Sequence, residues 1–136
     1  MPKTWLEKLE NGASPKVEVI EKPMMGLAAG AKLLISTPVE VRSLVAGLPP
    51  GRAVTIPQLR AELARRHGAD ATCQLTTSIF LRIVAEAAWD EHLAGKELEE
   101  ITPFWRIIGP KDPIAKKLRC GVDFLRNQRR FEGLAD

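Results

Sequence analysis

The chain has 136 residues, of which 45% are hydrophobic and 27% are charged, and its formal net charge is +3. A chain of this length is one domain by size and buries roughly two thirds of its unfolded surface, so its core requires no disulfide or metal. The charge and the pI of about 9.1 are only a mild indication of an anionic partner. There is no run of about eighteen apolar residues and no apolar segment behind a basic N-terminus, which excludes a membrane span and a secretory signal. We therefore expect a cytoplasmic protein with reduced thiols and no membrane partner.

The first part of the chain predicts only small elements. Thr4 to Leu9 has the pattern of a short amphipathic helix, and Lys16 to Ile20 alternates as an edge strand does. The segment from Met24 to Ala31 is apolar and rich in glycine, without a clear period, and predicts no element. We interpret residues 1–35 as an N-terminal appendage and residues 36–136 as the functional domain.

The next helices carry clear start signals. Thr37 to Glu40 combines a threonine N-cap, a proline in the first turn and a glutamate three residues on, which together predict a helix start. Thr55 to Gln58 repeats this pattern, and the helix that follows should end at His67-Gly68. A third helix should run from about Leu75 to His92. The residues of this third helix that we expect in the core are Ile79, Phe80, Ile83, Val84, Ala87 and Ala88.

The C-terminal part predicts two further helices. One should start at Asp112-Pro113, and Gly121 should separate it from a last helix over Val122 to Phe131. The elements together predict a mostly α fold with minor β and with winged-helix-like features.

Positive charge gathers in the C-terminal quarter. Eight Lys and Arg lie between Arg106 and Arg130 against two Asp, whereas the stretch from Glu86 to Glu100 is acidic. Three of these basic residues fall on one face of the last helix: Arg126, Arg129 and Arg130. Such a face is either a nucleic-acid footprint or a solvated helix surface, and both interpretations stay open.

The cysteines do not suggest a metal centre. Cys73 and Cys120 have no CxxC spacing, and only His67 and His92 are available to join them. We therefore predict no metal site and no cofactor.

The segment from Pro103 to Ile108 reads Pro-Phe-Trp-Arg-Ile-Ile, in the frame of the Pro-Cys-His-Arg-Val-Ile signature of O6-alkylguanine-DNA alkyltransferases. Three further segments resemble that family in the same order: Leu48 to Thr55, Arg82 to Ala87, and Phe131 to Leu134. The first resembles the start of the family's helix-turn-helix, the second its recognition helix and the third its closing Glu-Gly. The resemblance implies a winged-helix-like, helix-turn-helix DNA-binding domain of the alkyltransferase type, formed by the helix after Pro57 and by the helix from Leu75.

The departures from the family remove its chemistry. In the family, the cysteine of the signature accepts the alkyl group and the histidine helps to deprotonate it. Phe104 stands at the cysteine and Trp105 at the histidine, and neither side chain accepts a proton at neutral pH or forms a thioether. Ile56 stands at a tyrosine that helps to rotate the damaged nucleotide. The chain thus resembles the alkyltransferase-like branch, which lacks the cysteine, and we predict that it is not an enzyme.

The resemblance also implies a former alkyl pocket. Its residues in this chain are Pro103, Phe104, Trp105, Arg106, Glu132 and Ile56. Phe104 could fill this position as an ordinary core aromatic, or its ring could stack on an extruded base.

In the family, the arginine at the position of Arg82 enters the gap left by a rotated base. The residues that we expect to contact phosphates beside it are Thr55, Thr76, Thr77 and Ser78. The resemblance implies a non-catalytic protein that binds double-stranded DNA, senses alkylated guanine and presents it to a repair protein partner.

Two other hypotheses stay open. The acidic stretch from Trp89 to Glu100 could repel phosphate, which favours a protein–protein interaction module on the same scaffold that no longer binds DNA. Cys73 lies just before the third helix, where the helix dipole activates a thiolate, so the chain could also be a relict thiol alkyl acceptor.

Overall fold

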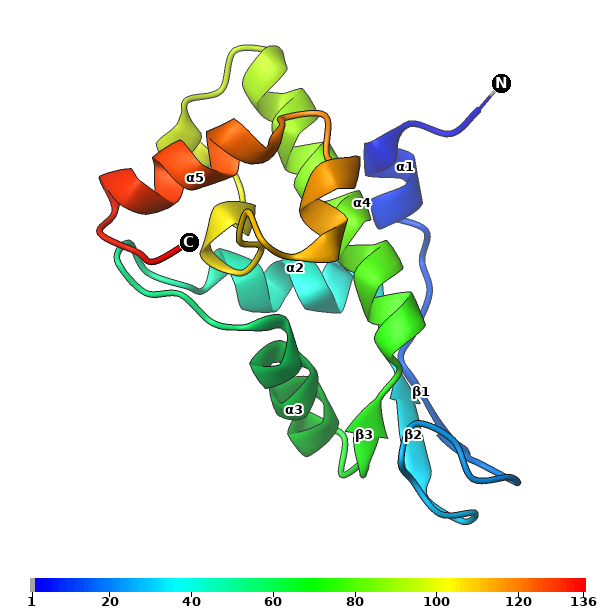
Figure 1. The fold of residues 1–136 in the computed structure, drawn as a ribbon. Coiled ribbons are helices and arrows are strands. Elements are labelled where there is room, and N and C mark those ends of the chain that lie inside the picture. Colours follow the sequence, from blue (N-terminus) through cyan, green and yellow to red (C-terminus); the bar gives the residue numbers. More distant parts are fainter. Residues whose placement is uncertain (1) are drawn as a thin grey trace.

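The computed structural model describes residues 2–136. Helices dominate it, and a small sheet has the strand order β1-β2-β3 (Figure 1). The expected mostly α fold with minor β is confirmed. The α-helices are α1 (Trp5–Leu9), α2 (Pro38–Ala46), α3 (Ile56–Arg66), α4 (Gln74–Leu93) and α5 (Val122–Phe131). The strands are β1 (Lys16–Val19), β2 (Lys32–Ile35) and β3 (Ala71–Thr72), and the 3-10 helices are η1 (Leu98–Glu100), η2 (Phe104–Arg106) and η3 (Pro113–Lys117).

The two capping signals form as predicted. The Thr37 hydroxyl accepts a hydrogen bond from the backbone N–H of Glu40, 3.1 Å away, and begins α2. At α3, the Thr55 hydroxyl accepts from the N–H of Gln58 at 3.2 Å, and the Gln58 side chain accepts from the N–H of Thr55 at 2.9 Å. Each cap satisfies N–H groups that have no partner within the helix, so the sequence determines where these helices begin.

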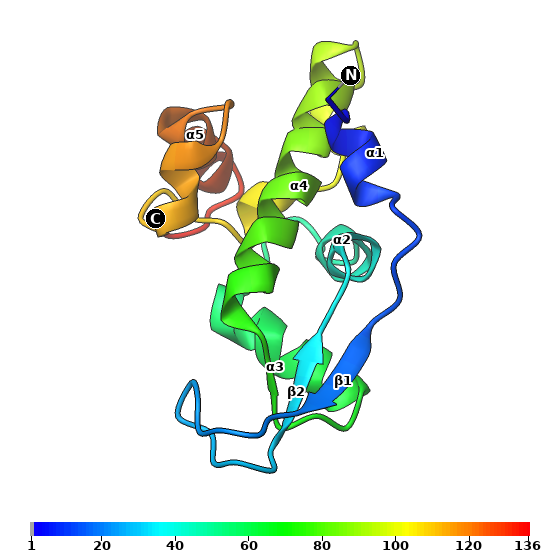
Figure 2. The same ribbon diagram turned by 90° about the vertical axis from the view of Figure 1, so that its right-hand side faces the viewer.

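α4 is the central element, with α1 and α2 on one side and α5 on the other (Figure 2). Four of its predicted core residues are buried: Ile83, Val84, Ala87 and Ala88. Phe80 is half-buried. The prediction was wrong for Ile79, which is 49% exposed because it lies on the side of α4 that faces a surface groove.

The segment interpreted as an appendage contributes to the same core. β1 pairs antiparallel with β2, and β2 pairs in parallel with β3. Leu34 of β2 is fully buried and Leu9 of α1 is 1% exposed, while α1 contacts α4 and α2. The described part of residues 1–35 is therefore integral to the fold.

The C-terminal part differs from the expectation at one element. The helix predicted from Asp112-Pro113 is only the 3-10 helix η3, because Leu118 leaves the helical conformation (φ −79°, ψ 135°) to reach the core, where it is 5% exposed. Gly121 adopts φ 87° directly before α5, a conformation that favours glycine, and it separates the two elements as predicted.

Candidate functional site

The two aromatic residues at the signature position lie inside the protein. Phe104 is 1% exposed and Trp105 is 2% exposed, and η2 holds both between α4 and α5. The Phe104 ring centroid lies 5.4 Å from that of Trp105 and 6.0 Å from that of Phe124. Phe104 therefore belongs to an aromatic cluster in the core and presents no ring surface to solvent.

A half-buried carboxylate, whose side chain is 9% exposed, ties this segment to the C-terminus. Glu132 accepts hydrogen bonds from Nε1 of Trp105 at 2.7 Å, from Nε of Arg106 at 2.9 Å and from the backbone N–H of Gly51 at 3.1 Å. Nη1 of Arg106 in turn donates to the carbonyl of Leu48 at 2.7 Å. One carboxylate thus joins three segments that lie far apart in the sequence.

The hydrogen bonds determine the charge state of this carboxylate. Burial raises the pKa of Glu132, but the hydrogen bonds from Arg106, Trp105 and Gly51 outweigh it and lower the pKa to about 2. The ionised form is therefore stable, and no proton is available here for acid–base chemistry near neutral pH.

The six residues that the resemblance assigns to an alkyl pocket do not line a single hollow. Pro103, Trp105, Arg106 and Glu132 line one hollow of about 370 Å³. Ile56 lines another, of about 200 Å³. The buried Phe104 ring lines neither. The structure therefore brings together most of these residues, but without Ile56 and without an opening at Phe104.

The basic face expected on α5 is only partly exposed. Arg129 is 9% exposed, and its guanidinium donates to the carbonyl oxygens of Trp105 at 2.8 Å and Ala135 at 2.7 Å. Nη1 of Arg126 pairs with Asp123 at 2.8 Å. Arg129 therefore fastens α5 to η2, and three aligned arginines do not form one free surface.

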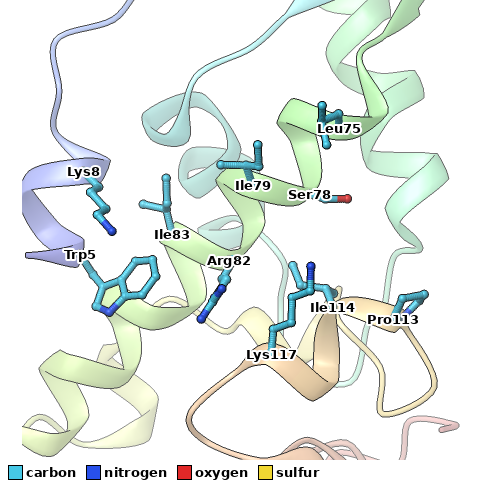
Figure 3. Close-up of a pocket in the computed structure, with 10 residues that line it drawn as sticks. All are labelled: Trp5, Lys8, Leu75, Ser78, Ile79, Arg82, Ile83, Pro113, Ile114 and Lys117. Carbon is cyan, nitrogen blue, oxygen red and sulfur yellow. The ribbon is translucent and has the colours of Figure 1, made fainter.

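A different surface gathers cations in one groove. A groove of about 400 Å³ runs along α4 between α1 and η3 (Figure 3). Its lining comprises Trp5 and Lys8 of α1, Leu75, Ser78, Ile79, Arg82 and Ile83 of α4, and Pro113, Ile114 and Lys117 of η3. Every charged residue in this lining is positive.

Arg82 points into this groove, between α1 and η3 (Figure 3). Its side chain is 40% exposed, and its guanidinium carbon lies 5.3 Å from the ring centroid of Trp5. Its Nε is buried without a hydrogen-bond partner, because the nearest carboxylate oxygen, Oε2 of Glu86, is 3.7 Å away. Arg82 is therefore half-buried, with its side chain accessible from the groove. The neighbouring Trp5 and Lys8 escaped the sequence reasoning, although their spacing of three residues on a short helix places them on one face.

Glu86, the acidic neighbour of Arg82 on α4, lies in the core. Glu86 is 1% exposed, and its Oε1 accepts from Nε of Arg119 at 3.0 Å. The Arg119 guanidinium also donates to Asp90 at 2.7 Å. A buried carboxylate needs such partners, and Arg119, which comes from a distant part of the chain, supplies them.

The four residues expected to contact phosphates have different environments. Ser78 is exposed and lines the groove, and Thr55 is exposed while its hydroxyl caps α3. Thr76 is half-buried, and its hydroxyl oxygen is buried without a partner. Thr77 is fully buried, and its hydroxyl donates to the carbonyl of Cys73 at 2.6 Å. Thr77 therefore has no exposed surface to offer to a phosphate, because its position on α4 faces the core.

The two thiols are half-buried and not bonded to each other. Cys73 stands at the N-cap of α4, as expected. Burial and, second, the charge of Glu86 raise the pKa of the Cys120 thiol to about 11. Among residues 2–136, no group of three or more His, Cys, Asp or Glu side chains could hold a metal ion.

The raised pKa predicts slow alkylation of Cys120. In a Cys73→Ser variant, where only Cys120 can react, iodoacetamide at pH 8 should modify the protein on the order of a hundredfold more slowly than an unperturbed thiol, because the thiolate is the nucleophile. Mass spectrometry of timed samples measures the rate. A rate equal to that of free cysteine would contradict the buried environment of Cys120.

Comparison of the chain with protein-family models, with curated proteins and with solved structures gives no match. Within the described residues, no helix is long and apolar enough to cross a membrane.

Proposed function

We propose that this chain is a non-catalytic DNA-binding protein that contacts DNA through the open face of α4 and the groove beside it. The observation that carries the proposal is the charge of that groove. Lys8, Arg82 and Lys117 line it, and none of their side chains makes a hydrogen bond within residues 2–136. Arg82 pairs with Glu86 only at 3.7 Å, and Lys8 and Lys117 form no ion pair within the described residues. Cations gathered on one face supply affinity for a phosphate backbone by releasing its counterions.

The arrangement of α3 and α4 supports a helix-turn-helix of the winged-helix, alkyltransferase type. The two helices are joined by a short connection that contains β3. Ser78 and Arg82 then project from the open face of α4, where a second helix of this motif meets DNA. A side chain such as that of Ser78 positions DNA through phosphate contacts, without reading its sequence.

The buried aromatic cluster supports binding without alkyl transfer. Phe104 and Trp105 occupy the signature positions at 1% and 2% exposure, and neither is a nucleophile or a base. Because the Phe104 ring fills its position, we propose that the protein binds normal and alkylated duplexes equally. Recognition of alkylated guanine on behalf of a repair partner, which the resemblance implies, would instead require an open pocket.

One observation favours a protein interaction module as a second candidate function. Leu75 is 71% exposed and Ile79 is 49% exposed, side by side along the groove. Apolar side chains one helical turn apart are typical anchors for a partner peptide. A partner suited to the groove would also carry acidic residues, because the groove's charges are positive.

Replacement of Arg82 tests the proposal. Arg82→Ala should weaken binding to duplex DNA about tenfold and lower the salt dependence by about one counterion, because one cation is lost from the interface. Fluorescence anisotropy at two salt concentrations measures both effects, with matched duplexes that contain or lack O6-methylguanine. Arg130→Ala removes an arginine that lies outside the groove and is the control, with little expected change. The absence of salt-sensitive binding in the wild type would contradict DNA binding and favour the interaction module.

A further inference from the structure

The tryptophan of α1 is surrounded by cations. Nζ of Lys8 lies 4.3 Å from the Trp5 ring centroid, and the guanidinium carbons of Arg82 and Arg119 lie 5.3 Å and 6.0 Å from it. Each of these distances is within the range of a cation–π interaction. One ring thus gathers three positive charges from α1, from α4 and from the segment after η3.

Trp5 is fixed in this position by the way α1 is built. The hydroxyl of Thr4 accepts from the N–H of Glu7 at 3.1 Å, and the Glu7 carboxylate accepts from the N–H of Thr4 at 3.0 Å. At the other end of α1, Leu9 is 1% exposed in the core. The indole is therefore part of the wall of the groove, rather than a side chain on a loose terminus.

The groove has unused donors beside this ring. The Arg82 side chain is 40% exposed and forms no hydrogen bond within the described residues, and its ion pair with Glu86 is long, at 3.7 Å. The side chains of Lys8 and Lys117 are exposed and form no ion pair within the described residues. An anionic group in the groove would gain charge-assisted hydrogen bonds from these cations.

Apart from Ser78, the remaining lining is apolar. Ile79 and Ile83 of α4 and Ile114 of η3 lie along the groove between the cations. Its volume of about 400 Å³ falls in the range of small-ligand sites. A ligand with a flat ring and an attached anionic group suits this groove. Its ring can pack against the indole and the isoleucines, while its anionic group pairs with the cations.

We propose that the groove binds one unpaired nucleotide of a nucleic-acid strand. Its base lies against Trp5 and the isoleucine wall, and its phosphate pairs with Lys8, Arg82 and Lys117. The inference rests on the proposed DNA-binding function and adds to it a preference for single-stranded or gapped DNA over an intact duplex. Base–aromatic stacking is independent of sequence, so the preference should hold for any base. Trp5 lies outside the segments that resemble the alkyltransferases, so the resemblance implies no role for it.

Substitution of Trp5 tests this proposal. Fluorescence anisotropy should show that the wild type binds a labelled oligothymidylate about tenfold more tightly than the same strand paired with its complement. Trp5→Leu keeps apolar volume but removes the aromatic ring, and should bind both forms equally. Trp5→Phe keeps a ring and should retain the preference. Trp89→Leu is the matched control, because Trp89 is also half-buried but packs against Phe124, outside the groove.

The possible outcomes separate this inference from the proposed function. The inference is supported if Trp5→Leu loses the preference for the single strand and keeps its melting temperature, while Trp5→Phe and Trp89→Leu retain the preference. Equal binding of strand and duplex by the wild type overturns the inference, while a loss of duplex binding in Arg82→Ala would still support DNA binding. If Trp5→Leu does not fold, Trp5→Phe provides the test through tryptophan fluorescence. Stacking of a base on Trp5 predicts that the strand quenches the fluorescence of the wild type but not that of Trp5→Phe, which keeps two tryptophans. Equal quenching in the two proteins would overturn the inference. Failure to bind either nucleic acid overturns both proposals.

Discussion

Replacement of Glu132 by alanine is expected to lower the free energy of unfolding by about 3 to 5 kcal/mol, because it leaves a buried partner charge uncompensated. The Glu132 carboxylate accepts from Arg106, whose side chain is 12% exposed, and from the indole N–H of Trp105. Without the carboxylate, both donors remain inside the protein with fewer partners. Urea unfolding followed by circular dichroism measures the difference.

The control for this prediction is Glu62→Ala. Glu62 also pairs with arginine, at 2.7 Å from Nη2 of Arg65, but the pair lies on the exposed side of α3. Exposed ion pairs contribute little because water and salt screen them, so a much smaller change is expected. If the two alanine variants lost equal stability, burial would not be the reason for the importance of Glu132.

The contribution of Glu132 should also depend on pH in a defined direction. Its pKa is about 2 in the folded protein against an ordinary value of 4.5, so the unfolded chain takes up the proton first as the pH falls. The stabilisation is complete above about pH 5, decreases between about pH 5 and 2 and is absent below that range. The shift corresponds to about 3 kcal/mol. The stability difference between wild type and Glu132→Gln should therefore shrink over this interval, and a constant difference would contradict the assignment.

The parts of the fold that could be predicted from sequence are those determined by local chemistry. Thr37 and Thr55 cap helices because their hydroxyls reach N–H groups three residues away, a relation that the sequence displays directly. The extent of α4 and the break at Gly121 followed from periodicity and backbone preference in the same way. These predictions required no knowledge of distant residues.

The parts that could not be predicted depend on partners far along the chain. Glu86 is buried because Arg119, 33 residues later, pairs with it. Ile79 is exposed because no element within residues 2–136 covers that side of α4. The groove has the same origin, since Trp5 reaches Arg82 only when α1 folds back onto α4. A single sequence shows which face of a helix is apolar, but not what the fold places against it.

Replacement of Phe104 by alanine is expected to destabilise the protein by about 3 to 5 kcal/mol, the usual loss for a large buried aromatic. Phe104 is 1% exposed, and its ring packs with those of Trp105 and Phe124. Phe131→Ala is the matched control, since that ring is 86% exposed, and its effect should lie within about 0.5 kcal/mol. Thermal and urea unfolding of the three proteins measure both effects.

The cavity left by Phe104→Ala gives this prediction a second measurement. A dry cavity lined by aromatic and aliphatic side chains binds small apolar molecules, so benzene should raise the melting temperature of the variant but not that of the wild type. Such binding would mean that the Phe104 ring alone fills this space and that the surrounding side chains keep their positions without it. A stable variant that does not bind benzene would mean that Trp105 or Phe124 moves into the space.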